Sequence, residues 1–200
     1  MKNMVDNDTI DYYDQNAEQY FKKTIDADMT ENCNRFIKHV IPDGKIIDIG
    51  AGSGRDILYF KSKGFQVEGI DASSELCRLA SAYTNMNVKC QRIQNWNPTE
   101  LYDGIWANAS LLHLTLEEIK KFFFRAESYL TDFGVLYVSF KSGISTGKDI
   151  EGRYFTNITR EKVQTIVAES STFDIVESWE TEDRLKRRGF EWINIILQKC

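Results

Sequence analysis

The chain has 200 residues, of which 42% are hydrophobic and 28% charged, and its formal net charge is −5 at pH 7. This length suits one well-buried α/β domain and is too short for two of ordinary size. No apolar run approaches the roughly 18 residues of a membrane span, and the polar N-terminus is not typical of a signal peptide. The net negative charge excludes general electrostatic attraction of nucleic acid. The cysteines are scattered without a C-x-x-C pair, which predicts reduced thiols and no metal site. We therefore expect a cytoplasmic protein without a membrane partner.

The first predicted element is an amphipathic helix from Tyr12 to Thr24, with Asp14 as its N-cap. Tyr12 itself lies outside the apolar stripe and is expected to face solvent. Two interpretations stay open: the helix packs on the domain, or it is a lid whose Tyr13 and Tyr20 close over a bound ligand. The stripe consists of Tyr13, Ala17, Tyr20, Phe21 and Thr24.

The next predicted element is a second amphipathic helix that begins with a cap at Thr30. Its end is predicted at the Pro42-Asp43-Gly44 sequence. One stripe collects its apolar side chains, so we expect it to pack into the core. That stripe consists of Cys33, Phe36, Ile37, Val40 and Ile41.

The stretch from Lys45 to Asp71 predicts a strand, a glycine turn, a helix and a second strand. A β-branched run precedes Gly50, Gly52 and Gly54, so the chain leaves a buried strand into a turn that only residues without Cβ enter at low cost. Such a turn lets a ligand touch the backbone, and the amide groups that open the next helix face the same point. Asp71 ends the second strand about twenty residues after the first glycine, where a carboxylate can accept both hydroxyls of a ribose. The stretch therefore predicts a nucleoside site.

Two details narrow the identity of the nucleoside. A dinucleotide fingerprint needs G-x-G-x-x-G, whereas this turn reads G-x-G-x-G and has Arg55 where the third glycine belongs. The turn therefore favours a ligand other than the pyrophosphate of a dinucleotide. Asp48, two residues before Gly50, puts a carboxylate at the end of the strand, which repels phosphates and suits an ammonium group. A cofactor with an amino-acid moiety fits both details.

With Asp48, the G-x-G-x-G turn and Asp71, the chain resembles the class I S-adenosylmethionine-dependent methyltransferases, and among them the small-molecule members. The resemblance implies an α/β fold: a single doubly wound, seven-stranded, mostly parallel sheet with helices on both faces and a C-terminal antiparallel hairpin. It also implies S-adenosyl-L-methionine as cofactor and S-adenosyl-L-homocysteine as product. We expect one domain over residues 1–200, made of an N-terminal lid or helical segment (1–41), a cofactor-binding core (42–140), a substrate loop (141–157) and a C-terminal helix and hairpin (158–200).

After a helix capped by Ser73, a third strand leads into the turn Ile93-Gln94-Asn95-Trp96. In the resembled family this turn holds the adenine, usually through an acidic residue, and Asn95 stands at that position. The sequence departs from the pattern here, but a side-chain amide oxygen can accept the same hydrogen bond. Trp96 can then lie on the purine face. The alternative is a turn asparagine beside a buried tryptophan.

The fourth strand, Tyr102 to Ala109, is followed by a Leu-x-His pattern that ends at His113. In the small-molecule members of the resembled family the same pattern recurs, and the carboxyl end of the strand, here Asn108 and Ala109, lies beside the methyl donor. His113 is either a structural hydrogen-bonding residue or a base for an acceptor that is protonated at working pH.

A fifth, apolar strand leads into an irregular stretch from Lys141 to Asn157. Long loops in compact domains are usually functional or disordered, and this one leaves the carboxyl end of a strand beside the expected cofactor. We therefore expect it to bind substrate through Lys141, Arg153 and Tyr154. A solvated surface loop is the alternative.

The last predicted elements are a helix capped by Thr159 and two long strands, Phe173 to Thr181 and Phe190 to Leu197. The resembled family has an antiparallel hairpin at this edge of the sheet. The tip of the hairpin is basic, which we interpret as a solvated turn, with an anion or RNA contact as the alternative. The basic residues are Arg184, Lys186, Arg187 and Arg188.

Together these features predict a methyltransferase that acts by in-line displacement on a small-molecule acceptor, with His113 and Tyr20 as the candidate catalytic residues. The alternatives are the same chemistry on tRNA or protein, and a non-catalytic nucleoside-binding module. We expect no nucleic-acid partner and no metal, and the sequence sets no oligomeric state. The expected cofactor contacts are Tyr13, Tyr20, Asp48, Gly50, Ala51, Gly52, Ser53, Gly54, Arg55, Asp71, Ala72, Ser73, Asn95, Trp96, Asn108 and Ala109.

Overall fold

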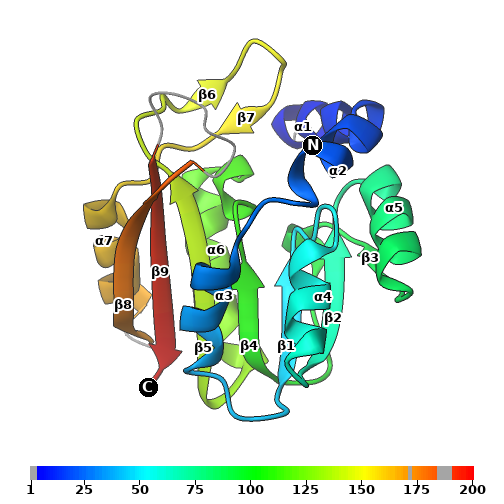
Figure 1. The fold of residues 1–200 in the computed structure, drawn as a ribbon. Coiled ribbons are helices and arrows are strands. Elements are labelled where there is room, and N and C mark those ends of the chain that lie inside the picture. Colours follow the sequence, from blue (N-terminus) through cyan, green and yellow to red (C-terminus); the bar gives the residue numbers. More distant parts are fainter. Residues whose placement is uncertain (1–3, 171–172, 184–190) are drawn as a thin grey trace.

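The computed structural model describes residues 4–170, 173–183 and 191–200, which contain one seven-stranded sheet (Figure 1). Its strand order is β3-β2-β1-β4-β5-β9-β8. Strands β1 to β5 pair in parallel, and β9 runs antiparallel to both β5 and β8. This arrangement confirms the predicted fold class. The strands are β1 (Lys45–Ile49), β2 (Gln66–Asp71), β3 (Lys89–Cys90), β4 (Tyr102–Ala107), β5 (Leu130–Lys141), β8 (Phe173–Glu182) and β9 (Glu191–Lys199).

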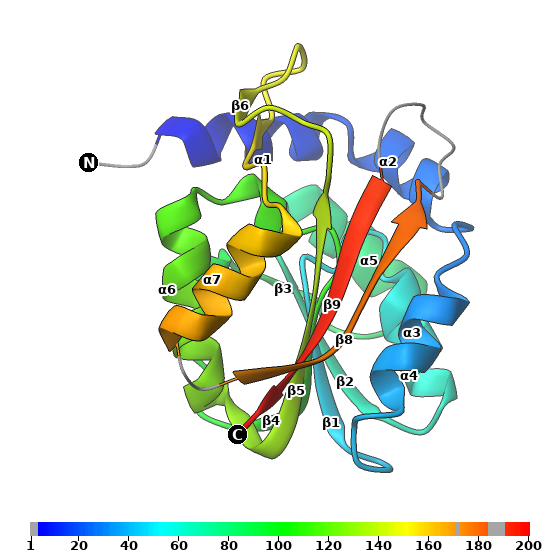
Figure 2. The same cartoon turned by 90° about the vertical axis from the view of Figure 1, so that its left-hand side faces the viewer.

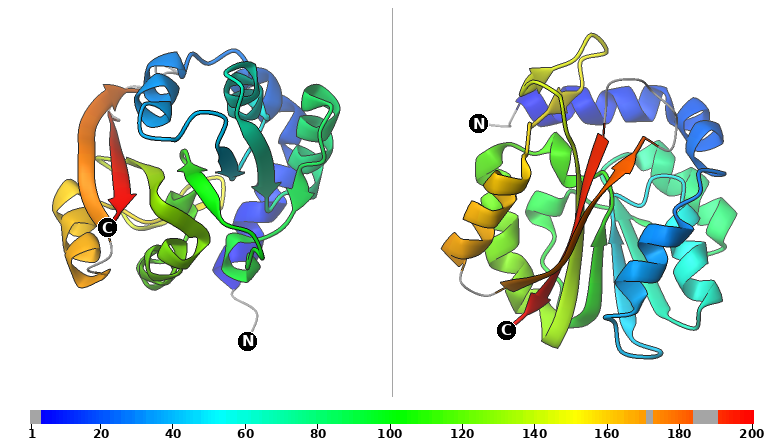
Figure 3. Two further views of the ribbon diagram at one scale, coloured as in Figure 1. Left: turned by 90° about the horizontal axis from the view of Figure 1, so that it is seen from below. Right: turned by 60° about the vertical axis from the view of Figure 1, so that its left-hand side comes forward.

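Helices cover both faces of the sheet, with α3, α4 and α5 on one face and α6 and α7 on the other (Figures 2 and 3). Each face has its own apolar core. Because the central strands are buried on both faces, they read as nearly continuous apolar runs; Ile46 and Ile47 of β1 are 0% exposed. The helices are α1 (Met4–Gln15), α2 (Ala17–Thr24), α3 (Thr30–Ile37), α4 (Arg55–Ser62), α5 (Ser74–Thr84), α6 (Leu116–Ala126) and α7 (Arg160–Ser170), with short 3₁₀ turns η1 (Ile93–Asn95), η2 (Leu111–His113) and η3 (Glu127–Tyr129).

The first two helices and a small hairpin lie across the carboxyl ends of the parallel strands (Figure 1). The hairpin consists of β6 (Gly147–Lys148) and β7 (Tyr154–Phe155). These elements therefore cover the edge at which open α/β sheets bind ligands. Among the helices in the described ranges, none has both the length and the apolar character of a membrane span.

The N-terminal helix differs from the sequence prediction in extent and in contacts. α1 begins at Met4, well before Tyr12, so Asp14 lies inside a helix and is not an N-cap. The Asp14 carboxylate instead accepts a hydrogen bond from the Ser73 hydroxyl (2.6 Å). Tyr12 was expected to face solvent, but the Arg153 guanidinium lies 4.7 Å from the centre of its ring. The helix is thus tied to two other segments through side chains that local periodicity does not pair.

Two further predictions need correction. Met29, and not Thr30, is the N-cap of α3, and the Asp28 carboxylate before it accepts from the Thr30 amide (2.9 Å). The helix ends at Ile37, which leaves Ile41 59% exposed and outside the core. The stretch 141–157 is not irregular throughout, since it contains the β6–β7 hairpin.

The core under α3 allows a direct test of the packing. Phe36 is 0% exposed, and its ring centre lies 5.2 Å from that of Trp106 and 5.6 Å from that of Phe60. Phe36→Ala should lower the free energy of unfolding by about 3–5 kcal/mol, because it leaves a cavity in a close-packed site. The control Ile41→Ala removes an exposed side chain and should change it by less than about 0.5 kcal/mol. Urea unfolding measures both, and equal losses would contradict this packing.

Candidate active site

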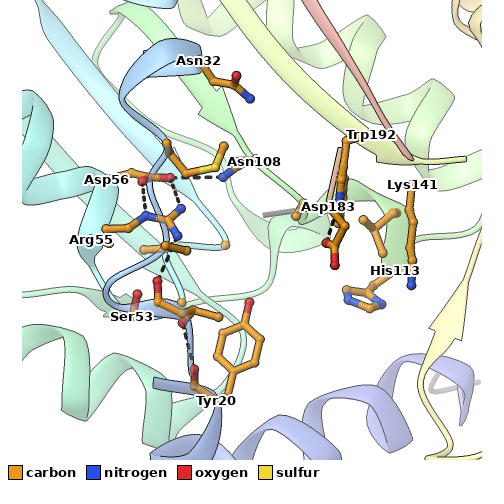
Figure 4. Close-up of a pocket in the computed structure, with 18 of the residues that line it drawn as sticks. Tyr20, Asn32, Ser53, Arg55, Asp56, Asn108, His113, Lys141, Asp183 and Trp192 are labelled. Carbon is orange, nitrogen blue, oxygen red and sulfur yellow. Dashed lines mark hydrogen bonds and ion pairs between the residues drawn. The ribbon is translucent and has the colours of Figure 1, made fainter. Parts of the chain in front are cut away.

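Two cavities meet above the glycine turn at the carboxyl ends of β1 and β4, and both are lined by Tyr20, Gly50, Gly52, Ala109 and His113. Because they share these residues, they are two parts of one crevice. The β2-side cavity is also lined by Tyr13, Asp71, Ala72, Ser73, Gln91, Ile93, Gln94 and Ser110. The β5-side cavity (Figure 4) is also lined by Asn32, Ala51, Ser53, Arg55, Asp56, Asn108, Lys141, Arg153, Phe155, Asp183, Trp192 and Asn194.

The three glycines of the turn have different reasons to lack a side chain. All have left-handed backbone, with φ of +76° at Gly50, +54° at Gly52 and +78° at Gly54. A Cβ on Gly50 would lie 2.4 Å from Ser110 Cβ, and one on Gly54 would lie 2.7 Å from Thr84 Cγ2, so protein packing excludes both. A Cβ on Gly52 would come no closer than 3.4 Å to another residue. The space that a side chain at Gly52 would occupy is therefore open to the crevice.

Asp71 holds the turn and faces the β2-side cavity. Its carboxylate accepts from the Gly52 amide and the Ser73 amide, each at 2.9 Å. The Ala72 amide is a third backbone donor, and because a carboxylate has about four lone pairs, acceptor capacity remains for a ligand in the cavity. Burial raises the pKa of Asp71, and the backbone donors oppose that rise. Asp71 thus lies at the end of β2 and lines the cavity, and its contact with a ribose stays a prediction.

Asp48 lies beneath the glycine turn and lines neither cavity. Its side chain is only 2% exposed. Burial raises its pKa, the neighbouring Asp56 carboxylate raises it further, and Arg55 opposes the rise. The direct contact with an ammonium group that the sequence suggested is therefore not available at Asp48. Gly54 likewise lies outside the lining of both cavities.

Arg55 and Asp56 form an ion pair at the start of α4. The Arg55 guanidinium donates to the two carboxylate oxygens of Asp56 at 2.7 and 3.0 Å. The same carboxylate accepts from the indole of Trp106 (3.0 Å) and the amide of Asn108 (3.2 Å). Asp56, which sequence reasoning missed, therefore fixes the expected ligand Asn108 at the end of β4. The only local signal was an acidic residue in the first turn of a helix, which usually indicates capping.

His113 lies between the two cavities with both ring nitrogens engaged. Nδ1 is 2.7 Å from the carbonyl oxygen of Tyr154, which can only accept, so Nδ1 carries the proton. Nε2 therefore accepts from the Tyr13 hydroxyl at 2.9 Å. Burial lowers the pKa of His113 to about 4, although the Tyr154 carbonyl opposes this. The imidazole is thus neutral at pH 7, with its lone pair directed at Tyr13.

The far wall of the β5-side cavity comes from β5, β7 and β9. Lys141, at the end of β5, is 9% exposed, and its ammonium lies 5.6 Å from the centre of the Phe155 ring. The Trp192 indole donates to the Asp183 carboxylate at 3.0 Å. Lys141 was expected at the site, whereas Phe155, Asp183 and Trp192 were not. The β6–β7 hairpin brings Phe155 to the cavity, and the pairing of β9 with β5 and β8 brings Trp192 and Asp183. No local sequence motif indicates these pairings.

Three residues that were expected to contact a ligand do not line the crevice with their side chains. Asn95 is exposed and lies outside the cavity lining. Trp96 is 4% exposed and packs on Tyr102 and Tyr129, with ring centres 5.8 and 5.0 Å away, so it does not reach a ligand in the crevice. Tyr154 contributes its backbone, not its side chain, to the site. The basic tip at 184–188 lies outside the described residues.

α1 is attached at both of its ends across the crevice. Toward its start, the Thr9 hydroxyl accepts from the Tyr154 amide (2.9 Å), and Asp8 forms an ion pair with Lys148. Toward its end, the Asp14 carboxylate accepts from the Glu75 amide (3.1 Å) at the start of α5. Tyr13, which lies between these attachments, and Tyr20 of α2 both face the crevice, with ring centres 5.1 Å apart.

The chemistry of the described side chains limits what the crevice can hold. Within the described ranges, no three His, Cys, Asp or Glu side chains are close enough to hold a metal ion together. The crevice instead offers bare backbone at Gly52, a buried carboxylate at Asp71, a neutral imidazole and aromatic walls. These groups suit an organic ligand with hydroxyls and an apolar ring.

Comparison with known proteins agrees with this geometry. A family model described as a methyltransferase domain matches residues 46–134. The phosphoethanolamine N-methyltransferase of Plasmodium falciparum is 23% identical over 162 residues, which cover 78% of this chain and 60% of that relative. The chain therefore spans about three fifths of the length of that relative.

Two solved structures share the fold. The Burkholderia thailandensis 1,6-didemethyltoxoflavin-N1-methyltransferase, with bound 1,6-didemethyltoxoflavin and S-adenosylhomocysteine, has a TM-score of 0.77 and 18% identity, and the match covers 98% of this chain and 87% of that one. The magnesium protoporphyrin IX methyltransferase of Synechocystis PCC 6803, with bound S-adenosylmethionine, has a TM-score of 0.72 and 16% identity, and the match covers 100% of both chains.

His113 gives folding stability a defined pH dependence. Its folded pKa of about 4 lies below the ordinary value of 6.5, so the unfolded chain binds more protons between these values. The stabilisation from neutral His113 is therefore complete above pH 6.5 and declines as the pH falls toward 4. In urea unfolding between about pH 4.5 and 7.5, the stability difference between the parent and His113→Gln should shrink as the pH falls. A difference that stays constant over this range would contradict the assigned neutral state.

Proposed function

We propose that the chain is a class I S-adenosylmethionine-dependent methyltransferase and that it transfers a methyl group from S-adenosyl-L-methionine to a small-molecule acceptor. One observation carries this proposal. The Gly52 backbone opens onto the crevice beside the Asp71 carboxylate, and the same crevice continues into a second cavity that can hold an acceptor. Donor and acceptor can therefore meet over the glycine turn.

The β2-side cavity fits the nucleoside part of this cofactor. Any side chain at Gly52 would project into the crevice, as expected where ligand touches backbone. The Ser110 hydroxyl is buried without a hydrogen-bond partner among the described residues, and Ser110 lines this cavity, so it is available to a ligand. Ile93 and Gln91 offer an apolar face and an amide for a purine. We assign these residues the adenine contacts first expected of Asn95 and Trp96.

The residues of the chain have mainly to hold and enclose the reactants. When bound, S-adenosyl-L-methionine supplies a methyl group on a positively charged sulfur, which a nucleophile displaces in line. Asp71 accepts from the ribose, and the turn residues Gly50 to Ser53 contact the methionine part. Tyr20, whose ring lies over Gly52, excludes water from the transfer site.

His113 is the base for an acceptor that is protonated at neutral pH. Its Nδ1 proton is committed to the Tyr154 carbonyl, so only Nε2 can take up a proton. The Tyr13 hydroxyl occupies Nε2 and must turn away, or pass the proton on, before His113 can act. A thiolate or a tertiary amine needs no such step.

The proposal for a small acceptor rests on the cover over the crevice. α1 and the β6–β7 hairpin are joined across it by the Thr9–Tyr154 hydrogen bond and the Asp8–Lys148 ion pair, which favours an acceptor that fits inside. Salt-dependent RNA binding would instead favour tRNA as the acceptor. A non-catalytic nucleoside-binding module would form no S-adenosylhomocysteine with any acceptor. The cytoplasmic location stays a prediction.

Cofactor binding should depend strongly on Asp71. Asp71→Ala should weaken the binding of S-adenosylhomocysteine by a few kcal/mol, since charge-assisted hydrogen bonds contribute about 1.5–3 kcal/mol each. Asp71→Asn keeps one acceptor oxygen and should lose less. The control Asp132→Ala removes an exposed carboxylate near the amino end of β5, away from the crevice. Calorimetry measures all four proteins, and unchanged affinity in Asp71→Ala would place the nucleoside elsewhere.

If α1 and α2 close over the bound cofactor, ligand should slow their amide exchange. We expect S-adenosylhomocysteine to increase protection between Asp11 and Thr24, while the amides of β5 from Gly134 to Phe140 change little because they already lie in the core. Hydrogen exchange with mass spectrometry follows both segments in one sample. If protection between Asp11 and Thr24 is equal with and without ligand, these helices have a purely structural role.

A further inference from the structure

The backbone just after β4 is strained at Ala109. Its φ is +53°, a left-handed conformation that residues with a Cβ rarely adopt. Asparagine and aspartate, the usual exceptions, can stabilise this conformation with their own side chains, and alanine cannot. Ala109 also lines both cavities of the crevice. Such strain persists only where the surrounding structure holds it, and it clusters at functional sites.

Ser139 on the neighbouring strand β5 holds Ala109 in this conformation. The Ser139 hydroxyl accepts from the Ala109 amide (2.8 Å) and donates to the side-chain carbonyl of Asn108 (2.9 Å). The Asn108 amide group donates to the Asp56 carboxylate (3.2 Å), which also binds Arg55 (Figure 4). The two residues that follow β4 are therefore fixed by one continuous chain of hydrogen bonds.

The place of Ser139 in the sheet supports such a role. Ser139 is 1% exposed and lies between Val138 and Phe140 on a central strand, where apolar side chains are the rule. A buried hydroxyl is unfavourable unless it is hydrogen-bonded. The bonds to Ala109 and Asn108 offset this cost and link β5 to the end of β4.

The residue after Ala109 is Ser110, which lies against the glycine turn. A Cβ built on Gly50 would lie 2.4 Å from Ser110 Cβ and 3.3 Å from its Oγ. The Ser110 hydroxyl is buried and has no hydrogen-bond partner in the part of the chain that the structure describes. In the sheet order β3-β2-β1-β4, Ile93 follows β3, Asp71 ends β2 and Gly50 follows β1. A donor with adenine at Ile93 and ribose at Asp71 therefore brings its sulfur toward Ser110.

We propose that Ser110 contacts the positively charged sulfonium end of the donor, and that Ser139 is a positioning residue that holds Ala109 so that Ser110 can do so. This inference rests on the proposed function, because it assigns one part of the same crevice. A hydroxyl oxygen attracts the polarised C–H groups of a sulfonium, whereas the thioether of S-adenosylhomocysteine is neutral. Ser110 therefore favours the methylated cofactor over the demethylated product.

Calorimetry tests the contact without an acceptor, through the ratio of the dissociation constants of S-adenosylhomocysteine and S-adenosylmethionine. Ser110→Ala and Ser139→Ala should each lower this preference for S-adenosylmethionine by about two- to fivefold, the strength of one weak C–H···O hydrogen bond. In both variants the methyl proton resonance of bound [methyl-13C]S-adenosylmethionine should move upfield from its position in the parent. The control Ser128→Ala removes an exposed hydroxyl on η3 and should keep the parent ratio.

A second pair of variants tests whether Ser139 acts through Ala109. Glycine adopts a positive φ without strain, so a chain with Ala109→Gly depends less on the Ser139 hydroxyl. Ser139→Ala should therefore lower the ratio in the Ala109 parent and lower it less in the Ala109→Gly background. Equal changes in the two backgrounds would overturn the positioning role of Ser139.

The outcomes separate this inference from the proposed function. Thermal unfolding shows which variants are folded, and Ser110→Ala, which removes a hydroxyl without a described partner, should melt like the parent. If Ser110→Ala has the same ratio of dissociation constants as the parent, the sulfonium contact is wrong, although the methyltransferase proposal stands. Failure of the folded parent to bind either ligand would overturn the proposed function itself.

Discussion

The hydrogen bond from the Gly52 amide to the Asp71 carboxylate joins the ends of β1 and β2, and the rest of the site depends on it. The left-handed backbone at Gly50, Gly52 and Gly54 lets the turn fold back on β2, where the amides of Gly50 and Ala51 both donate to the Ile70 carbonyl. The turn is therefore shaped by the sheet and stays bare toward the crevice. A ligand finds backbone and carboxylate already in place.

The cover over the crevice is linked to the same carboxylate. The Ser73 amide donates to Asp71, and the Ser73 hydroxyl donates to Asp14 of α1. A continuous hydrogen-bonded path thus runs from the helix above the crevice through the start of α5 to the glycine turn. At its other end α1 contacts the hairpin, where the Tyr154 carbonyl also fixes the tautomer of His113. Enclosure of the donor and orientation of the base therefore use the same two attachments.

The parts of this site that sequence predicts are those encoded within one βαβ unit. The glycine turn and Asp71 follow from residue types at short spacing, and the fold class was implied by the family resemblance that this motif carries. Asp56 was missed because its partner Trp106 is 50 positions away. Asn95 was expected to contact adenine because it stands at the position of the acidic ligand in the resembled family. The chain forms a 3₁₀ turn there, in which successive side chains rotate by about 120°, so Ile93 lines the cavity and Asn95 faces out.

The central claim is that one crevice holds the donor across the glycine turn and leaves the β5-side cavity open beside it. A crystal structure of the protein with S-adenosylhomocysteine tests this claim most directly. We predict density for adenine beside Ile93 and Gln91, for the ribose hydroxyls at Asp71, and for the homocysteine part along Gly50 to Ser53, with Lys141 and Trp192 still accessible. Density for the nucleoside in the β5-side cavity, or at another site on the protein, would contradict the account.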